Sequence, residues 1–484
     1  MGLAGILIAL GLLIWLAYRG WSVLLLAPLA ALIAAGLSGQ PLLAHWTLTF
    51  MQGAAGFVAQ FFPLFLLGAL FGKLMDDSGS VQAIARTMTE KLGTRRAILA
   101  VVLAGGLVTY GGVSLFVAFF VLAPMAQALF RAADIPARLM PAAIALGTTT
   151  FTMSALPGTP AIQNAIPMPF FGTTPFAAPG LGIISAGVMF GFGMWWLQWR
   201  AASARRSHEG YGGAIARTPQ EVADDPLLRE RITTAREFDP GEIDGGARCS
   251  DPPSFGIAVL PLGVVVGVNL LMSFVVLPRL DTSYLATPAW GNTSMAAVGG
   301  VWSVIVALLA AIAVLVVLNH SRITALRESM DAGANAAVLP VMSVASLVGF
   351  GAVVAALPAF ATVREWVLGI DGGPLVSLAV ATNILAALTG SASGGLSIAL
   401  DALGSTYMQI AHSTGIDPGL MHRVAVIGAG TLDSLPHNGA VVTLLAVCGC
   451  THKDSYFDIV MAAVVSAILA LATVIVLGTL LGSF

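Results

Sequence analysis

The sequence predicts an all-α polytopic membrane protein. Hydrophobic residues make up 57% of the 484-residue chain and charged residues only 10%, whereas a soluble domain carries about 25% charged residues. The apolar residues occur in runs of roughly 17 to 25, the length needed to cross a hydrocarbon core of about 30 Å. Glycine and proline interrupt several of these runs near their centres. A large soluble core does not explain so many charge-free runs.

Eight apolar segments without interruption are predicted to span the membrane. They are residues 2–17, 22–38, 53–72, 178–199, 255–277, 295–318, 334–352 and 457–482. The first is expected to be a spanning helix rather than a secretory signal, because a basic n-region and a small-residue cleavage site are not evident. The three cysteines form neither a metal-ligand spacing nor a disulfide framework. No metal and no cofactor is therefore expected.

Four further hydrophobic segments are interrupted. Residues 96–130 and 373–411 each have two apolar arms around a glycine-rich tip, "TYGGVS" and "TGSASGG". We expect both to be re-entrant hairpins, because non-helical backbone at membrane depth is tolerated only when it is buried in protein. Residues 138–169 and 420–449 are expected to cross as broken helices. The residues expected to make the breaks are Pro157, Gly158, Pro160, Pro436 and Gly439.

The order of segments predicts two inverted repeats, residues 1–199 and 255–484, joined by a polar linker over 200–254. Each half has three helices, a glycine hairpin, a broken helix and a final helix. "TMSALPGTPAIQNAI" aligns with "TLDSLPHNGAVVTLL", which matches Leu156 and Pro157 with Leu435 and Pro436. Inverted repeats with broken helices are typical of secondary transporters.

The basic residues predict the orientation in the membrane. With ten crossings, 19 of the 22 lysines and arginines fall on one side. The other side carries only Arg279, Arg364 and Arg423. The positive-inside rule therefore places the 200–254 loop in the cytoplasm and both termini outside. We expect a multi-pass protein of a bacterial cytoplasmic membrane.

The breaks predict an anion site. A half-helix that starts after a break presents unpaired N–H groups and the positive end of its dipole. No lysine or arginine is expected at the midplane, so helix ends would bind a small carboxylate. Any single Ser or Thr is more simply explained by a bond to its own helix. The candidate binding residues are Thr109, Tyr110, Ser114, Ser154, Thr159, Gln163, Asn164, Thr389, Ser391, Ser393, Ser434, His437 and Asn438.

Asp433 is the leading candidate for coupling transport to protons. An acid at membrane depth is costly and indicates function, and His437 is expected to share its proton or orient the substrate. The alternative is that Asp433 caps the second half-helix. Asp401 is a weaker candidate, and His412 and His422 are expected at the outer surface.

Three rival classes are weighed against this interpretation. An intramembrane enzyme is disfavoured, because the sequence contains neither GxSxG nor HExxH. A channel is disfavoured by the two closed glycine tips, and a net charge of −2 does not favour nucleic acid as a partner. Sodium coupling stays open, because hairpin tips such as "SASGG" are suitable sodium sites.

The chain resembles the gluconate permease family of bacterial proton-coupled symporters, within the ion-transporter superfamily. "YGGVSLFVAFFVLAPMAQALFRAADIP" is similar to the family's first hairpin and the loop after it. "LPGTPAIQNAIP" stands where gluconate permeases have a break like "LPPHPGPTA". "GAGTLDSLPHNGAVVTLLAVCG" and "THKDSYFDI" most resemble the 3-hydroxybutyrate permease branch.

This resemblance implies import of a small monocarboxylate such as 3-hydroxybutyrate with a proton, by an elevator-like movement. The first break departs from the family pattern because it lacks the histidine, with Gly158 and Thr159 after Pro157. That departure favours a shorter acid over a sugar acid such as gluconate, which stays the alternative. Related folds imply a homodimer, in which amphipathic residues 81–93 and 358–369 would link the scaffold to the moving part.

Overall fold

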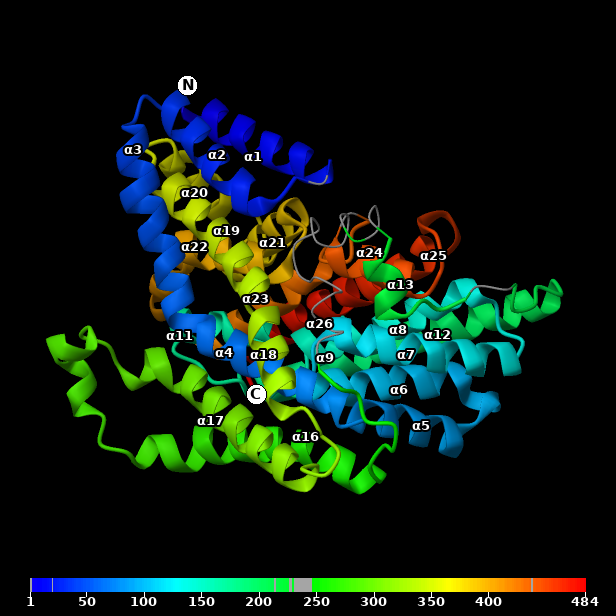
Figure 1. The fold of residues 1–484 in the computed structure, drawn as a ribbon. Coiled ribbons are helices and arrows are strands. Elements are labelled where there is room, and N and C mark those ends of the chain that lie inside the picture. The colour runs from blue at the N-terminus through cyan, green and yellow to red at the C-terminus, as the bar shows by residue number, and fades with distance from the viewer. Residues whose placement is uncertain (1, 20, 213–214, 226–228, 230–245, 437) are drawn as a thin grey trace.

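The computed structural model describes residues 2–19, 21–212, 215–225, 229, 246–436 and 438–484. The regular secondary structure of these residues is entirely helical (Figure 1). Within the described part of the chain, seven helices are long and apolar enough to cross a membrane, or eight if one bent pair is a single span. The predicted all-α, multi-spanning architecture is therefore confirmed.

Each of the eight predicted uninterrupted spans is helical. The corresponding helices are α1 (Gly2–Tyr18), α2 (Val23–Leu37), α4 (Met51–Asp77), α12 (Pro179–Arg206), α16 (Phe255–Leu271), α17 (Met295–Leu318), α19 (Val338–Ala356) and α26 (Ser466–Leu481). Several are longer than predicted, because adjoining turns continue them. The helix that contains α4 runs through π-helical turns from Leu42, α18 (Leu326–Ala336) leads into α19, and α25 (His452–Ile459) leads into α26.

Six of these helices pack in one continuous series. From one edge to the other the series runs α1, α2, α19, α4, α17, α16. Its centre is the crossing of α4 and α19, where a Cβ on Gly53 would lie 2.8 Å from Ala352 Cβ. A Cβ on Gly349 would lie 2.8 Å from the Phe50 carbonyl oxygen. Small residues at both positions let the two backbones approach closely, as is common in membrane helix packing.

Two helix pairs occupy the segments predicted as hairpins. They are α6 (Ala97–Tyr110) with α7 (Leu115–Ala132), and α21 (Pro374–Thr389) with α22 (Ala392–Thr414). A glycine with positive φ turns the chain at each tip, Gly112 at +101° and Gly390 at +66°. Ser114 and Ser391 then cap the second helix of each pair. Both tips thus end in a capped helix N-terminus.

Two helices are broken as expected around proline. The first consists of α8 (Met140–Thr148), α9 (Phe151–Ser154), α10 (Ile162–Ala165) and α11 (Pro167–Phe171), and the second of α23 (Pro418–Thr431) and α24 (Gly439–Val447). Pro157, Gly158 and Pro160 lie in the first break, and Pro436 lies in the second. Gly439 is the first residue of α24 rather than part of the break.

Two short amphipathic helices precede the hairpins. They are α5 (Ser80–Leu92) and α20 (Phe360–Leu368), which coincide with the two predicted amphipathic segments. The chain bends by 103° between α5 and the helix that follows it. Each short helix therefore connects the packed series of long helices to a hairpin.

The described parts of the 200–254 loop lie against the helices. Near its start, α13 (Pro219–Ala223) follows Arg217, whose N–H donates to the Val447 carbonyl. Near its end, Arg248 pairs with Asp76 of α4 at 2.9 Å. The loop is thus attached to the bundle at both ends.

The structure corrects the predicted surface position of two residues at the start of α23. Arg423 and His422 were expected on the outer surface, but both are fully buried. Charge counting places a basic residue near a helix end in the flanking solvent. Here the loop at 173–178 covers the start of α23, because Thr173 and the Ala177 carbonyl bond His422 and Arg423.

Candidate functional site

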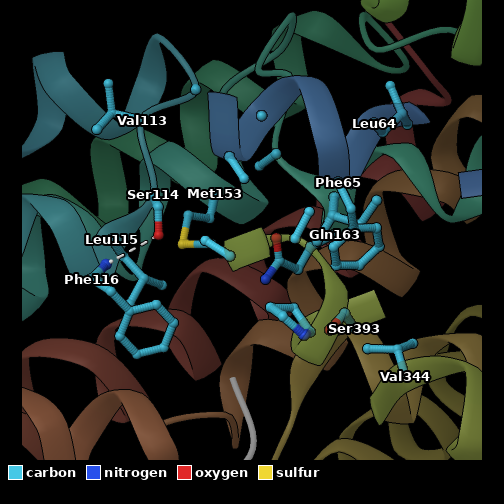
Figure 2. Close-up of a pocket in the computed structure, with 18 of the residues that line it drawn as sticks. Leu64, Phe65, Val113, Ser114, Leu115, Phe116, Met153, Gln163, Val344 and Ser393 are labelled. Atoms are coloured by element: carbon cyan, nitrogen blue, oxygen red, sulfur yellow. Dashed lines mark hydrogen bonds between the residues drawn. The ribbon is translucent and has the colours of Figure 1, made fainter. Parts of the chain in front are cut away.

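A cavity of about 230 Å³ lies between the packed long helices and the two hairpin tips (Figure 2). One wall comes from α4, α18 and α19, and the other from the tips and the first break. In Figure 2, Ser114 and Met153 stand on one side of this space, and Gln163 and Ser393 lie across from them. The polar lining residues are Lys73, Thr109, Ser114, Gln163, Ser343, Thr389, Ser391 and Ser393.

The cavity brings together six of the predicted binding residues, from both halves of the chain. They are Thr109, Ser114, Gln163, Thr389, Ser391 and Ser393. The described residues of the second break do not line it, and neither do Tyr110, Ser154, Thr159 and Asn164. His437, proposed for binding and for proton transfer, lies outside the described residues.

Two helix N-termini face this cavity. Ser114 Oγ accepts from the Phe116 N–H at 3.4 Å, and the residues from Ser114 to Val117 line the wall. Ser391 Oγ accepts from the Gly394 N–H at 3.2 Å and lies 3.1 Å from Ser393 Oγ. The ends of α7 and α22 therefore direct positive dipole ends and hydroxyl groups at the same space, which favours a bound anion.

The lining groups differ in how free they are to bind a ligand. Thr109 donates to the Gly105 carbonyl and Thr389 to the Leu385 carbonyl, both at 2.8 Å, so each hydroxyl bonds its own helix. Gln163 Oε1 is buried and has no hydrogen-bond partner among the described residues. A buried polar atom without a partner is costly. Gln163 is therefore the lining amide best placed to bind a ligand.

Each hairpin tip is bonded to the break in its own half. In the first half, the Tyr110 hydroxyl donates to the Pro157 carbonyl at 2.8 Å. In the second half, the Asn438 amide donates to the Gly390 carbonyl at 2.8 Å. Tyr110 and Asn438 thus join tip to break instead of lining the cavity.

Asp433 caps a hairpin helix. Its Oδ1 accepts from the Ala392 N–H, at the start of α22, and from Asn438 Nδ2, both at 2.8 Å. The half-helix α24 is capped by Asn438, whose Oδ1 accepts from the Ala440 N–H at 2.7 Å. A capping role for Asp433 was weighed from the sequence, but the structure assigns it to a different helix.

A buried polar cluster holds the first break against α23. Arg423 donates to the carbonyls of Ser154 and Ala177 and to Asn164 Oδ1. The His422 ring bonds Asn164 through Nε2 and the Thr173 hydroxyl through Nδ1. Among the described residues, Arg423 has no carboxylate partner. Its charge is instead distributed over carbonyl oxygens, including one at the end of α9.

Two other predicted residues of the first break also serve its internal structure. Thr159 Oγ1 accepts from the Ala161 N–H at 3.3 Å. The Ser154 hydroxyl donates to the Thr150 carbonyl at 3.1 Å. In the second break, Ser434 is buried and its carbonyl accepts from the Tyr456 hydroxyl at 3.2 Å. These contacts shape the breaks, and none of these three residues lines the cavity.

Lys73 and Asn269 are among the buried polar residues that the sequence interpretation missed. Lys73 lines the cavity although it was counted as a cytoplasmic flanking charge, and its spacing of four from Asp77 in "GKLMDD" is the available signal. Asn269 donates to the Gly158 carbonyl at 3.1 Å, from α16 to the first break. A single amide within the apolar run "VVVGVNLLMSF" is the signal there.

Two solved structures of transport proteins have a similar fold. The YdaH transporter of Alcanivorax borkumensis aligns with a TM-score of 0.52 at 17% identity, over 90% of this chain and 88% of that one. MtrF of Neisseria gonorrhoeae aligns with a TM-score of 0.53 at 15% identity, over 90% and 85%. The chain therefore shares the fold of these two solved structures.

The chain belongs to the GntP family of permeases. The model of that family, described as GntP family permease, matches residues 1–170. The uncharacterized transporter YxjC of Bacillus subtilis is 42% identical over 466 residues, or 95% of each chain. The high-affinity gluconate transporter of Escherichia coli is 34% identical over 146 residues, or 29% of this chain and 31% of that one.

These relatives confirm the family resemblance. They also agree with the prediction of a transporter rather than an enzyme, since they are transporters or permeases. The chain is a multi-pass protein of the bacterial inner membrane.

Proposed function

We propose that this permease imports a small hydroxy-monocarboxylate with a proton, and that 3-hydroxybutyrate is the first substrate to test. The main support for this proposal is the lining of the cavity. It combines one cationic side chain, two helix N-termini and the free Gln163 amide with a mainly apolar wall. The positive groups suit a carboxylate, Gln163 and the serines suit one hydroxyl, and the apolar wall suits a methyl group.

Gluconate is the second candidate, and the names of two relatives favour it. They are the high-affinity gluconate transporter of Escherichia coli and the gluconate permease of Bacillus licheniformis, the latter 33% identical over 122 residues. Each hydroxyl of a sugar acid that enters without a partner costs affinity. The small number of free polar groups in this cavity therefore favours the shorter acid.

We propose further that transport is of the elevator type, with inverted repeats over 1–199 and 255–484. The series α1, α2, α19, α4, α17, α16 supports the repeat, because corresponding helices of the two halves occur in the same order from either end. The bonds between each tip and its own break support a moving body that contains both hairpins. The cavity lies between this body and the helix series, where such a movement would carry a bound anion.

The coupling ion is proposed to be a proton taken up by a buried acid. Asp433 with His437 is the candidate from the sequence, and sodium is the competing ion. A homodimer with both termini outside completes the proposal. Native mass spectrometry in lipid that gives only monomers would remove the dimer.

Uptake of labelled acid into proteoliposomes tests the function. We expect accumulation of 3-hydroxybutyrate under an imposed pH gradient and none under a sodium gradient alone. Gluconate is the parallel substrate, and liposomes without protein are the control. Accumulation of gluconate but not of 3-hydroxybutyrate would reverse the order of the two substrates. Failure of both acids under both gradients would refute the proposal.

A further inference from the structure

Lys73 is the one ionisable side chain among the described residues that line the cavity. It lies near the end of α4 with its side chain 6% exposed. Its Nζ donates to Asp77 Oδ1, one turn further along the helix, at 2.8 Å. The other polar groups of the lining are neutral hydroxyls and one amide. Lys73 is therefore the single side-chain cation among the described lining residues, and it is already paired.

Asp77 is fully buried, and only one of its two carboxylate oxygens accepts a hydrogen bond from a described residue. Its Oδ2 has no hydrogen-bond donor among the described residues, and the same holds for the Ser329 hydroxyl of α18. Both atoms lie against Gly246, where a Cβ would be 2.5 Å from Asp77 Oδ2 and 3.0 Å from Ser329 Oγ. Gly246 has a φ of +94°. Asp77 Oδ2 thus lies in a closed polar space beneath the end of the 200–254 loop.

The other charged residues around Asp77 are either paired or exposed. On its own helix, Asp76 Oδ2 pairs with Arg248 of the loop at 2.9 Å, and Asp76 Oδ1 has no hydrogen-bond partner among the described residues. The neighbouring Cys249 N–H donates to the Asp77 backbone carbonyl at 2.8 Å. The charged residues of the two other adjoining helices are exposed: Arg327, Glu328 and Asp331 on α18, and Arg86, Glu90 and Lys91 on α5. Among the described residues, Lys73 is the cation that pairs with Asp77.

We propose that the substrate carboxylate replaces Asp77 as the partner of Lys73, and that Asp77 then takes up the transported proton. This inference rests on the proposed function and specifies its ion coupling. The Lys73 ammonium leaves Asp77 Oδ1 and donates to the substrate carboxylate, and one proton adds to Asp77. When the substrate leaves, the proton leaves and the ion pair forms again. No covalent bond changes, and one anion moves with one proton.

The cost of an unpaired buried charge drives the exchange. A buried carboxylate that loses its counter-ion becomes neutral rather than stay ionised. Lysine suits this role because its ammonium lies on a flexible four-carbon stem and keeps its charge with either partner. Since binding takes up a proton, apparent affinity for the anion rises as the pH falls, by up to about tenfold per pH unit.

Proton uptake on substrate binding tests the exchange directly. Purified protein in weakly buffered detergent solution is mixed with 3-hydroxybutyrate or gluconate, and a pH indicator reports the protons taken up. We expect about one proton per bound anion for the wild type. Asp77→Asn should bind the anion without proton uptake and lose the pH dependence of affinity. Asp331→Asn, which removes an exposed acid of α18, is the matched control and should behave as the wild type.

Lysine variants separate binding from folding. Lys73→Gln should weaken binding by roughly 10- to 100-fold, the size expected for a lost hydrogen bond to a charged group. Because that variant leaves Asp77 unpaired, the double variant Lys73→Gln/Asp77→Asn restores a neutral pair. It should fold like the wild type and still bind weakly. Wild-type affinity in the double variant would overturn the role of Lys73.

The outcomes distinguish this inference from the proposed function. If the wild type transports an acid under a pH gradient and Asp77→Asn still takes up one proton per anion, the exchange is wrong while the function stands. If Asp433→Asn alone abolishes proton uptake, the coupling acid is in the second break. If the wild type moves neither acid under any gradient, the proposed function itself fails.

Discussion

The two helix breaks occupy corresponding places in the sequence but contact different parts of the molecule. The first break contributes Pro160 and Gln163 to the cavity and is held from outside by Arg423 of the other half. The described part of the second break does not reach the cavity. It is bonded to its own hairpin through Asp433 and Asn438. Both breaks are bonded to a hairpin tip, but only the first lines the cavity with its described residues.

The two hairpins differ in the long helices against which they pack. The helix α22 packs along α19, whereas α7 meets its counterpart α4 at only a few points. The first tip instead lies against α16, where a Cβ on Gly111 would be 2.8 Å from Leu262 Cβ. Both tips are therefore packed against long helices, but against different ones.

Of the variants that test this comparison, Arg423→Leu should cause the largest loss of stability and transport. It leaves the carbonyls of Ser154 and Ala177 without their Arg423 donor, at about 1–3 kcal/mol for each buried group. The Asn164 oxygen keeps only His422 as a partner. We expect thermal unfolding in detergent at a clearly lower temperature and loss of transport. Arg423→Lys keeps the charge but not the planar fork, so it should fall between the leucine variant and the wild type. Arg364→Leu, at an exposed site on α20, is the control.

Asp433→Asn should have the next largest effect. Asparagine keeps one oxygen to accept from the Ala392 N–H but loses the charge that favours the α22 N-terminus. We expect a folded protein with slower uptake that still accumulates acid under a pH gradient. If accumulation disappears while exchange of substrate persists, Asp433 carries the proton and the second break does more than hold its tip.

Gln163→Ala should weaken binding by about tenfold, because one hydrogen bond to the ligand is lost. Gln163→Glu should weaken it further, since it adds a negative charge to an anion site. The measurement is the substrate dependence of uptake, with Gln52→Ala, an exposed glutamine on α4, as the control. Unchanged affinity in both Gln163 variants would show that the first break does not bind the ligand.

Tyr110→Phe should have the smallest effect. It removes the bond between the first tip and the Pro157 carbonyl, which is worth about 1 kcal/mol. Asn438→Ala removes four side-chain hydrogen bonds between the second break, its hairpin tip and α24. It should cost more, because these bonds include a helix cap worth about 1 kcal/mol. Unfolding in denaturant measures both. Equal losses in the two variants would mean that the two tips are held with similar strength.

Several features of the fold followed from the sequence alone. Run length identified eight helical segments, six of which are long enough to span a membrane. The tips at "TYGGVS" and "TGSASGG" and the prolines at 157 and 436 located the interruptions. These features are local, because the length of an apolar run and the backbone freedom of glycine or proline act within a few residues. Six of the predicted binding residues also reached the cavity, since they lie at those interruptions.

The tertiary structure alone decided which polar groups meet. Arg423 bonds a carbonyl 269 positions away, and Asp433 caps a helix whose first N–H is 41 positions away. Charge counting assigned Arg423 and Lys73 to the solvent beside the membrane, because it places a basic residue only by how near it is to the end of an apolar run. Burial depends instead on what packs over that end, and such contacts between distant segments leave no periodic trace in the sequence. The partners of the charged residues were therefore decided by packing.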